Sequence, residues 1–125
     1  MPTEFTVKLA DRPGQLASLA AALGAARVNI RAIGATKGTV GIVVGDKDTA
    51  KARRALKKGK YRASERPAIE LRLNDKSGSL AAAAKRFAKG KVNIASVYAM
   101  APGRGKVSVA FGVKNARAAK KALGR

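Results

Sequence analysis

The chain repeats itself, and this repeat restricts its possible folds more than any other feature of the sequence. Two motifs of the first half return 64 residues later: D-R-P-G-Q-L at 11–16 returns as D-K-S-G-S-L at 75–80, and V-N-I at 28–30 returns at 92–94. Further on, the stretch from Val40 to Leu56 matches Val107 to Leu123 at a shift of 67. The three extra residues fall around Pro102-Gly103-Arg104, a turn-like sequence where insertion is tolerated. We therefore expect two tandem copies of one unit, residues 1–65 and 66–125.

Each copy shows the same order of expected elements. Apolar residues alternate with polar ones in a first strand, and then recur at helical spacing. The strand residues are Phe5, Val7 and Leu9 or Ile69, Leu71 and Leu73, and the helix residues are Leu16, Leu19 and Leu23 or Leu80, Ala83 and Phe87. A second strand begins near each V-N-I motif. Its alternation slips between Ile30 and Ile33, which indicates a β-bulge.

The rest of each copy predicts a third strand and a second helix. The strands carry Val40, Ile42 and Val44 or Val107, Val109, Phe111 and Val113. Asp48 and Asn115 are the expected N-caps of the helices that follow. In copy one, residues 61–64 predict a short closing strand, whereas in copy two the sequence stops at Arg125, before the matching strand.

The order strand-helix-strand-strand-helix-strand predicts the fold class α+β, as two tandem ferredoxin-like βαββαβ units. Each unit should be an antiparallel sheet with both helices on one face. The second unit should lack its last strand. The edge left open by that missing strand would accept a strand from the first copy or from another molecule.

The turn before the first helix and the asparagine before the second strand are the candidate binding features. Gly14 allows close approach to the backbone, and the free N–H groups of a helix start can hold a carboxylate. Asn29 and Asn93 stand between apolar neighbours, and a carboxamide offers both a donor and an acceptor to an amino acid. The alternative is purely structural, with Gly and Pro making the turn and Asn capping the connection.

D-R-P-G-Q-L, then an Ala/Leu-rich helix, then V-N-I resembles the signature of the ACT domain family, and the resemblance covers nearly the whole chain as two copies. It implies ferredoxin-like regulatory modules that commonly bind amino acids, as in the small stand-alone tandem ACT proteins. It also implies a ligand site between two ACT units, where the loop after the first strand of one unit faces the Asn region of the other.

Carried over to matching positions, the resemblance implies two sets of ligand-binding residues. They are Asp11, Arg12, Pro13, Gly14, Gln15, Leu16, Asn29 and Ile30 in the first copy, and Asp75, Gly78, Ser79, Leu80, Asn93 and Ile94 in the second. The ligand carboxylate would meet the helix-start amides, with Arg12 as a further candidate, and its ammonium would meet Asp11 or an Asn carboxamide. Lys76-Ser77 replaces Arg12-Pro13 in copy two, so the two sites need not be equivalent.

The charge of the chain suggests a different class of function. Lys and Arg number 27 against seven acids, a net charge of +20, which attracts nucleic acid at low salt. Basic residues also line the expected second helices, at positions 51, 53, 54, 57, 58, 60 and 62 and at positions 114, 117, 120 and 121. This pattern fits either a solvated helix face or a groove for phosphates.

The same strand order occurs in RNA-recognition motifs, so residues 104–111 were compared with the third-strand RNA signature. Lys106 and Ser108 occupy two positions where that signature has aromatic residues, which removes the base-stacking platform. This argues against sequence-specific RNA binding and leaves non-specific electrostatic binding open.

Enzymatic activity, cofactors and metals are not expected. The chain has no His and no Cys, the usual general base and soft metal ligands, and its carboxylates are scattered. Asp46 and Asp48 are close in sequence, but at a strand-to-helix turn a cap is the simpler explanation. No phosphate-loop or dinucleotide motif is present.

The sequence also lacks a long apolar run or a signal-peptide pattern, so we expect a cytoplasmic protein with no membrane association. The main prediction is a non-enzymatic sensor that binds an amino acid where ACT units meet, forms a homodimer and acts on a regulated partner protein. The first alternative is a basic module that docks on nucleic acid or on an acidic protein. A second alternative is a purely structural or oligomerising role.

Overall fold

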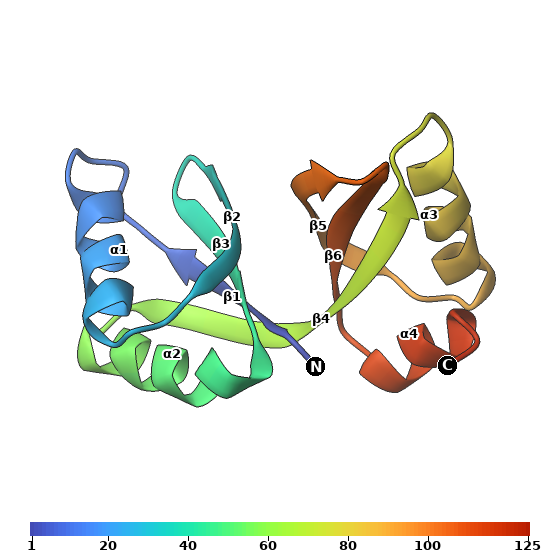
Figure 1. Cartoon of the computed structure of the whole chain (residues 1–125). Helices are drawn as coiled ribbons and strands as arrows, with labels where there is room; N and C mark the ends of the chain where they lie inside the picture. The colour runs from blue at the N-terminus through green and yellow to red at the C-terminus, as the bar shows by residue number, and fades with distance from the viewer. The chain divides into compact units, whose positions relative to one another are not determined.

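A computed structural model describes all residues, 1–125, and divides them into two compact units, Met1–Glu65 and Arg66–Arg125. Both units consist of an antiparallel sheet and two helices (Figure 1). None of the four helices is long and apolar enough to span a membrane.

Unit 1 contains the complete order of elements. These are β1 (Thr3–Lys8), α1 (Gln15–Ala25), β2 (Ile30–Thr36), β3 (Thr39–Val44), α2 (Asp46–Lys58) and the first residues of β4 (Arg62–Asn74). Both β1 and β2 pair antiparallel with β3, in the order β2-β3-β1-β4. This is the ferredoxin-like order predicted from the alternating strand and helix patterns.

Unit 2 repeats this arrangement without a fourth strand. It consists of the rest of β4, α3 (Ser79–Lys89), β5 (Ile94–Gly103), β6 (Lys106–Val113) and α4 (Ala116–Ala122). The strand order is β4-β6-β5, with antiparallel pairing of β6 to both neighbours. The prediction that the second unit lacks its last strand is confirmed.

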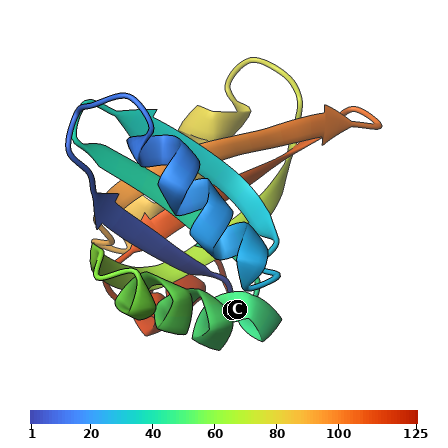
Figure 2. The same ribbon diagram turned by 90° about the vertical axis from the view of Figure 1, so that its left-hand side faces the viewer.

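Both helices of unit 1 cover the same face of its sheet (Figure 2). The core of this unit joins the two helices to the strands, and its fully buried side chains are Phe5, Val7, Leu19, Leu23, Ile42, Val44, Ala52 and Leu56. In unit 2 the matching core contains two aromatic rings, Phe87 and Phe111, whose centroids lie 5.1 Å apart at an interplanar angle of 55°. A tilted pair of this kind is a favourable aromatic contact.

The two expected irregularities of the strands are present. The pairing of β2 with β3 shifts register between Ile30 and Ala32, and β5 shifts between Ile94 and Ser96 at the matching place. The three-residue insertion of copy two falls at a second shift, between Ala99 and Pro102. The inserted residues therefore lengthen a hairpin and leave the core strands in register.

The closing strand expected at residues 61–64 is present, and it continues into the first strand of the second copy as one strand, β4. One expectation from the sequence was wrong: Asp48 is not an N-cap. Helix α2 begins at Asp46 with Gly45 as its N-cap, so Asp48 lies inside the first turn. Asn115 does cap α4, and its Oδ1 accepts a hydrogen bond of 3.0 Å from the Ala118 amide.

Candidate functional site

The two predicted turns have the same backbone conformation. Gly14 and Gly78 both have φ of 87°, in the left-handed region, and both are the N-caps of the helices that follow. Neither helix start has a side-chain cap or an acidic residue in its first turn, whereas α2 has Asp46 and Asp48 there. The Gln15 and Ser79 amides donate to the Arg12 and Lys76 carbonyls at 3.4 and 3.3 Å. The next two amides of each helix lack partners within the helix, so both starts are suited to an anion such as a carboxylate.

Each turn is tied to the neighbouring hairpin. In unit 1 the Leu9 amide donates to the Gly38 carbonyl at 3.1 Å, and Lys37 Nζ lies 3.8 Å from Asp11 Oδ2. In unit 2 the Asp75 amide donates to the Gly105 carbonyl at 2.9 Å. Asp11, Arg12 and Pro13 are exposed, so the hairpin holds the loop in place while its side chains remain accessible to a ligand.

The asparagines lie at the other end of the same sheet. Antiparallel pairing places the end of β1 beside the start of β3 and the end of β2, whereas Asn29 precedes the first residue of β2. The Asn29 and Asn93 side chains are both exposed, and Ile30 and Ile94, at the strand starts, are half-buried. One unit by itself therefore does not bring its turn and its asparagine together.

A buried carboxylate positions the Asn29 backbone, and the sequence did not reveal it. Asp48 is only 3% exposed. Its Oδ2 accepts from the Asn29 amide at 3.2 Å, and its Oδ1 lies 2.9 Å from Lys51 Nζ. The bond from Lys51 has the largest effect and that from the Asn29 amide the next, and both hold the pKa of the Asp48 carboxyl below its ordinary value. Lys51 also donates to the Arg27 carbonyl at 2.9 Å, so the turn before β2 is fastened to α2 at two points.

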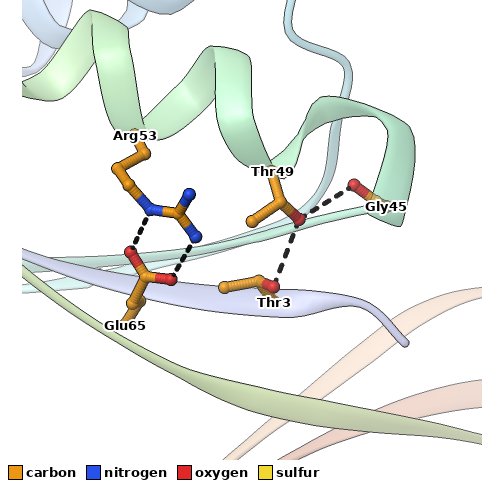
Figure 3. Close-up of polar contacts among 5 residues, drawn as sticks. All are labelled: Thr3, Gly45, Thr49, Arg53 and Glu65. Carbon is orange, nitrogen blue, oxygen red and sulfur yellow. Dashed lines mark hydrogen bonds and ion pairs between the residues drawn. The ribbon is translucent and has the colours of Figure 1, made fainter.

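Further contacts join α2 to β1 and β4 (Figure 3). Arg53 forms two hydrogen bonds to Glu65, of 2.8 and 2.7 Å, and these lower the pKa of the Glu65 carboxyl. In the first turn, the Thr49 hydroxyl lies 3.2 Å from that of Thr3 and donates to the Gly45 carbonyl at 3.3 Å. A short contact joins the N-terminal amine to Asp46. The basic residues of α2 therefore do not form one uniform solvated face.

Large apolar side chains are exposed at matching positions of the two units. Leu16 and Leu80 follow the first residues of α1 and α3 and are 48% and 52% exposed. Ile33 on β2 and Val97 on β5 are 50% and 48% exposed. Both pairs are related by the 64-residue repeat. Exposed apolar residues that recur in both copies mark a surface suited to contact with another protein unit.

A cavity of about 460 Å³ lies beside the predicted turn of unit 2. Gly78 and Ser79 line it together with four basic residues, Arg72, Lys76, Arg86 and Lys106. The side chains of Arg86 and Lys106 also bond within the unit, to the Leu123 carbonyl at 2.6 Å and to Asn74 Oδ1 at 2.5 Å. The lining is suited to a small anion beside the helix start. No group of three His, Cys, Asp or Glu residues lies close enough together to hold a metal ion.

Neither the comparison with protein-family profiles nor that with curated proteins gave a match. The comparison with solved structures gave matches. Protein BT0572 of Bacteroides thetaiotaomicron matches 98% of this chain and 85% of its own, with a TM-score of 0.79 and 21% identity. The regulatory subunit of aspartate kinase from Thermus thermophilus matches 98% of this chain and 89% of its own, with a TM-score of 0.72 and 19% identity. The chain has the tandem ACT-domain fold.

Two of the matching structures are named as regulatory parts of aspartate kinases. A further match is a putative C-terminal regulatory domain of aspartate kinase from Porphyromonas gingivalis W83, with a TM-score of 0.56 and 16% identity over 98% of this chain. The family resemblance in the turn and V-N-I motifs therefore predicted the fold correctly. At this level of identity the likeness concerns the ACT fold alone.

Proposed function

We propose that this chain is a non-enzymatic, cytoplasmic regulatory module that binds an amino acid at its ACT-like units. The observation that carries the proposal is the pair of matching helix starts after Gly14 and Gly78. Both have a left-handed glycine, no side-chain cap and no acidic residue in the first turn of the helix. The ligand carboxylate binds at these amides, which the helix dipole makes favourable for an anion.

The remaining contacts come from the two predicted sets of residues. Arg12 supplements the carboxylate site in unit 1, and Lys76 occupies the corresponding place in unit 2. Asp11, or the carboxamide of Asn29 or Asn93, takes the ammonium group. Since a turn and an asparagine lie at opposite ends of one sheet, a complete site combines the turn of one unit with the asparagine of another.

The exposed apolar residues support a homodimer as the working form. Leu16 and Leu80 are immediately beside the proposed carboxylate sites, so a second unit that covers them would also close the site. Binding would then change how the units pack, and a regulated partner protein would respond to that change. The partner is expected to recognise the assembled form.

A thermal-shift screen against the twenty amino acids tests the proposal. A ligand that binds only the folded state stabilises it by about 2.7 kcal/mol at a hundredfold excess over its dissociation constant. We expect a saturable rise in melting temperature with one amino acid or a small related group. The Asn29→Ala/Asn93→Ala variant should lose this rise, whereas a control with Ser64→Ala and Lys114→Ala should retain it. No rise with any amino acid would refute the proposal, and an unchanged rise in the Asn variant would remove the asparagines from the site.

A further inference from the structure

Each unit has a basic groove between its two helices, on the side away from the sheet. The groove of unit 1 lies between α1 and α2 and has a volume of about 620 Å³, and that of unit 2 lies between α3 and α4 and has a volume of about 680 Å³. We define these as groove 1 and groove 2. They involve none of the residues proposed to bind an amino acid.

The two grooves are copies of each other. The repeat matches Ala26 with Gly90 and Ala55 with Ala122 on the floors, and Arg54 with Lys121 on the rims. Every residue that lines either groove is alanine, glycine, lysine or arginine. An acid-free, cationic lining at the same place in both units indicates an anionic occupant.

The rim cations are available to bind a ligand. Lys51 and Arg86 are engaged within the protein, by Asp48 and by the Leu123 carbonyl. Arg54 and Lys58 are exposed, have no ion pair, and lie four residues apart on one face of α2. At groove 2, Lys89 and Lys121 are likewise exposed and have no ion pair. Two positive side chains are therefore free on the rim of groove 1, and three on the rim of groove 2, where Lys91 is also exposed and has no ion pair.

The floors limit what the occupant can be. A Cβ on Gly90 would come within 2.7 Å of the Ala122 Cβ, so the helices of unit 2 are in close contact beneath the groove. An occupant must lie along the surface rather than insert a ring or a side chain. No aromatic residue lines either groove, so bases have nothing to stack on. Neither groove has a large apolar residue. The centre of a protein interface, or a membrane anchor, would require such residues.

From these observations we infer that grooves 1 and 2 bind the phosphate backbone of duplex DNA, without regard to sequence. A DNA duplex offers about one negative charge per 1.7 Å, a dense array of phosphates for the free rim cations to contact. The inference also accounts for the net charge of +20, which amino-acid binding leaves unexplained.

Fluorescence anisotropy with a labelled 24-base-pair DNA duplex at 150 mM salt tests the inference. The groove variant carries Arg54→Gln, Lys58→Gln, Lys89→Gln and Lys121→Gln. The control variant removes the same charge from exposed lysines outside both grooves, as Lys8→Gln, Lys85→Gln, Lys114→Gln and Lys120→Gln. Both variants have a net charge of +16, and neither alters a buried residue, so melting temperatures should stay close to that of the unsubstituted protein.

We expect the groove variant to bind the duplex at least tenfold more weakly than the control variant. The slope of log Kd against log salt concentration should fall by about 3 to 4 in the groove variant, because each phosphate contact contributes about 0.9. Equal weakening of both variants would overturn the inference, since the charge would then act without a defined site. Tighter binding to the single strand, to poly-glutamate or to phosphatidylserine vesicles than to the duplex would also overturn it. Amino-acid binding should be the same in both variants, so this test and that of the proposed function fail independently.

Discussion

Units 1 and 2 have the same backbone plan but hold their second helices in different ways. Helix α2 has 13 residues and is fastened through Asp48 to the turn before β2 and through Arg53 to Glu65. Helix α4 has seven residues, and the residue that matches Asp48 is Asn115, which caps its own helix instead. The duplication therefore preserved the fold while the polar contacts around the second helix diverged.

This divergence affects the candidate ligand residues unequally. The Asn29 backbone is held by a buried, charged partner. Asn93 has no such partner, because Ala118 stands where unit 1 has Lys51 and Asn115 is turned to the Ala118 amide. Ordering a flexible segment on binding weakens affinity. We therefore expect a site that uses Asn29 to bind more tightly than one that uses Asn93.

The largest expected difference between the units lies in their cores. Phe87 of unit 2 matches Leu23 of unit 1, and both are fully buried. Phe87→Ala should lower the free energy of unfolding by about 3–5 kcal/mol, because it leaves a larger cavity and removes the contact with Phe111. Leu23→Ala should lower it less, within the range of about 2–5 kcal/mol for a buried leucine. Urea denaturation measures both losses, and an equal or larger loss for Leu23→Ala would show that the aromatic pair adds nothing to unit 2.

A smaller difference in stability is expected between substitutions of Asp48 and of Asn115, which match in the repeat but have different roles. Asn115→Ala removes an N-cap and should lower the free energy of unfolding by about 1 kcal/mol. Asp48→Ala should lower it further, because the Asn29 amide loses its partner and the Lys51 ammonium keeps only its bond to the Arg27 carbonyl. The amide of Asn29 should also exchange with deuterium faster in the Asp48 variant. If the two substitutions have equal effects and Asn29 exchange is unchanged, the network does not position Asn29.

The smallest expected effect concerns pH. The pKa of Asp48 is lowered from its ordinary value of 3.8 by its bonds to Lys51 and Asn29. Its stabilising contribution is therefore complete above about pH 4 and is lost as pH falls further, toward the lower pKa of the folded state. The melting temperatures of the unsubstituted protein and of Asp48→Asn should differ at pH 7 and converge toward pH 3. A difference that persists undiminished at pH 3 would mean that the carboxylate charge is not what matters.

The sequence predicted the fold well because the fold depends on local patterns that occur twice. The strand alternation, the Gly14 and Gly78 turns and the slip after Ile30 all appear in the structure at the predicted places. The prediction that Asp48 is an N-cap was wrong because three residues that commonly cap helices, Asp46, Asp48 and Thr49, lie close together. Their capping preferences are too similar to show which position begins the helix. The burial of Asp48 depends on the Asn29 amide, 19 residues away.

The candidate site was predicted less completely than the fold. The residue types were found at the turns, but the sequence did not show that a turn and an asparagine lie at opposite ends of one sheet. That separation follows from the antiparallel pairing of β2 with β3. The two interhelical grooves were anticipated only as basic helix faces, because their Ala and Gly floors are formed by residues from two different helices.

The central claim is that the helix starts after Gly14 and Gly78 bind an amino-acid carboxylate. The most direct test is an NMR titration that follows the backbone amides of residues 15–17 and 79–81 as each of the twenty amino acids is added. The account predicts saturable shifts at these amides with one amino acid or a related group, and none with the corresponding amino-acid amide, which lacks the carboxylate. Equal shifts with the amide derivative, or no saturable shift at either helix start with any amino acid, would contradict it.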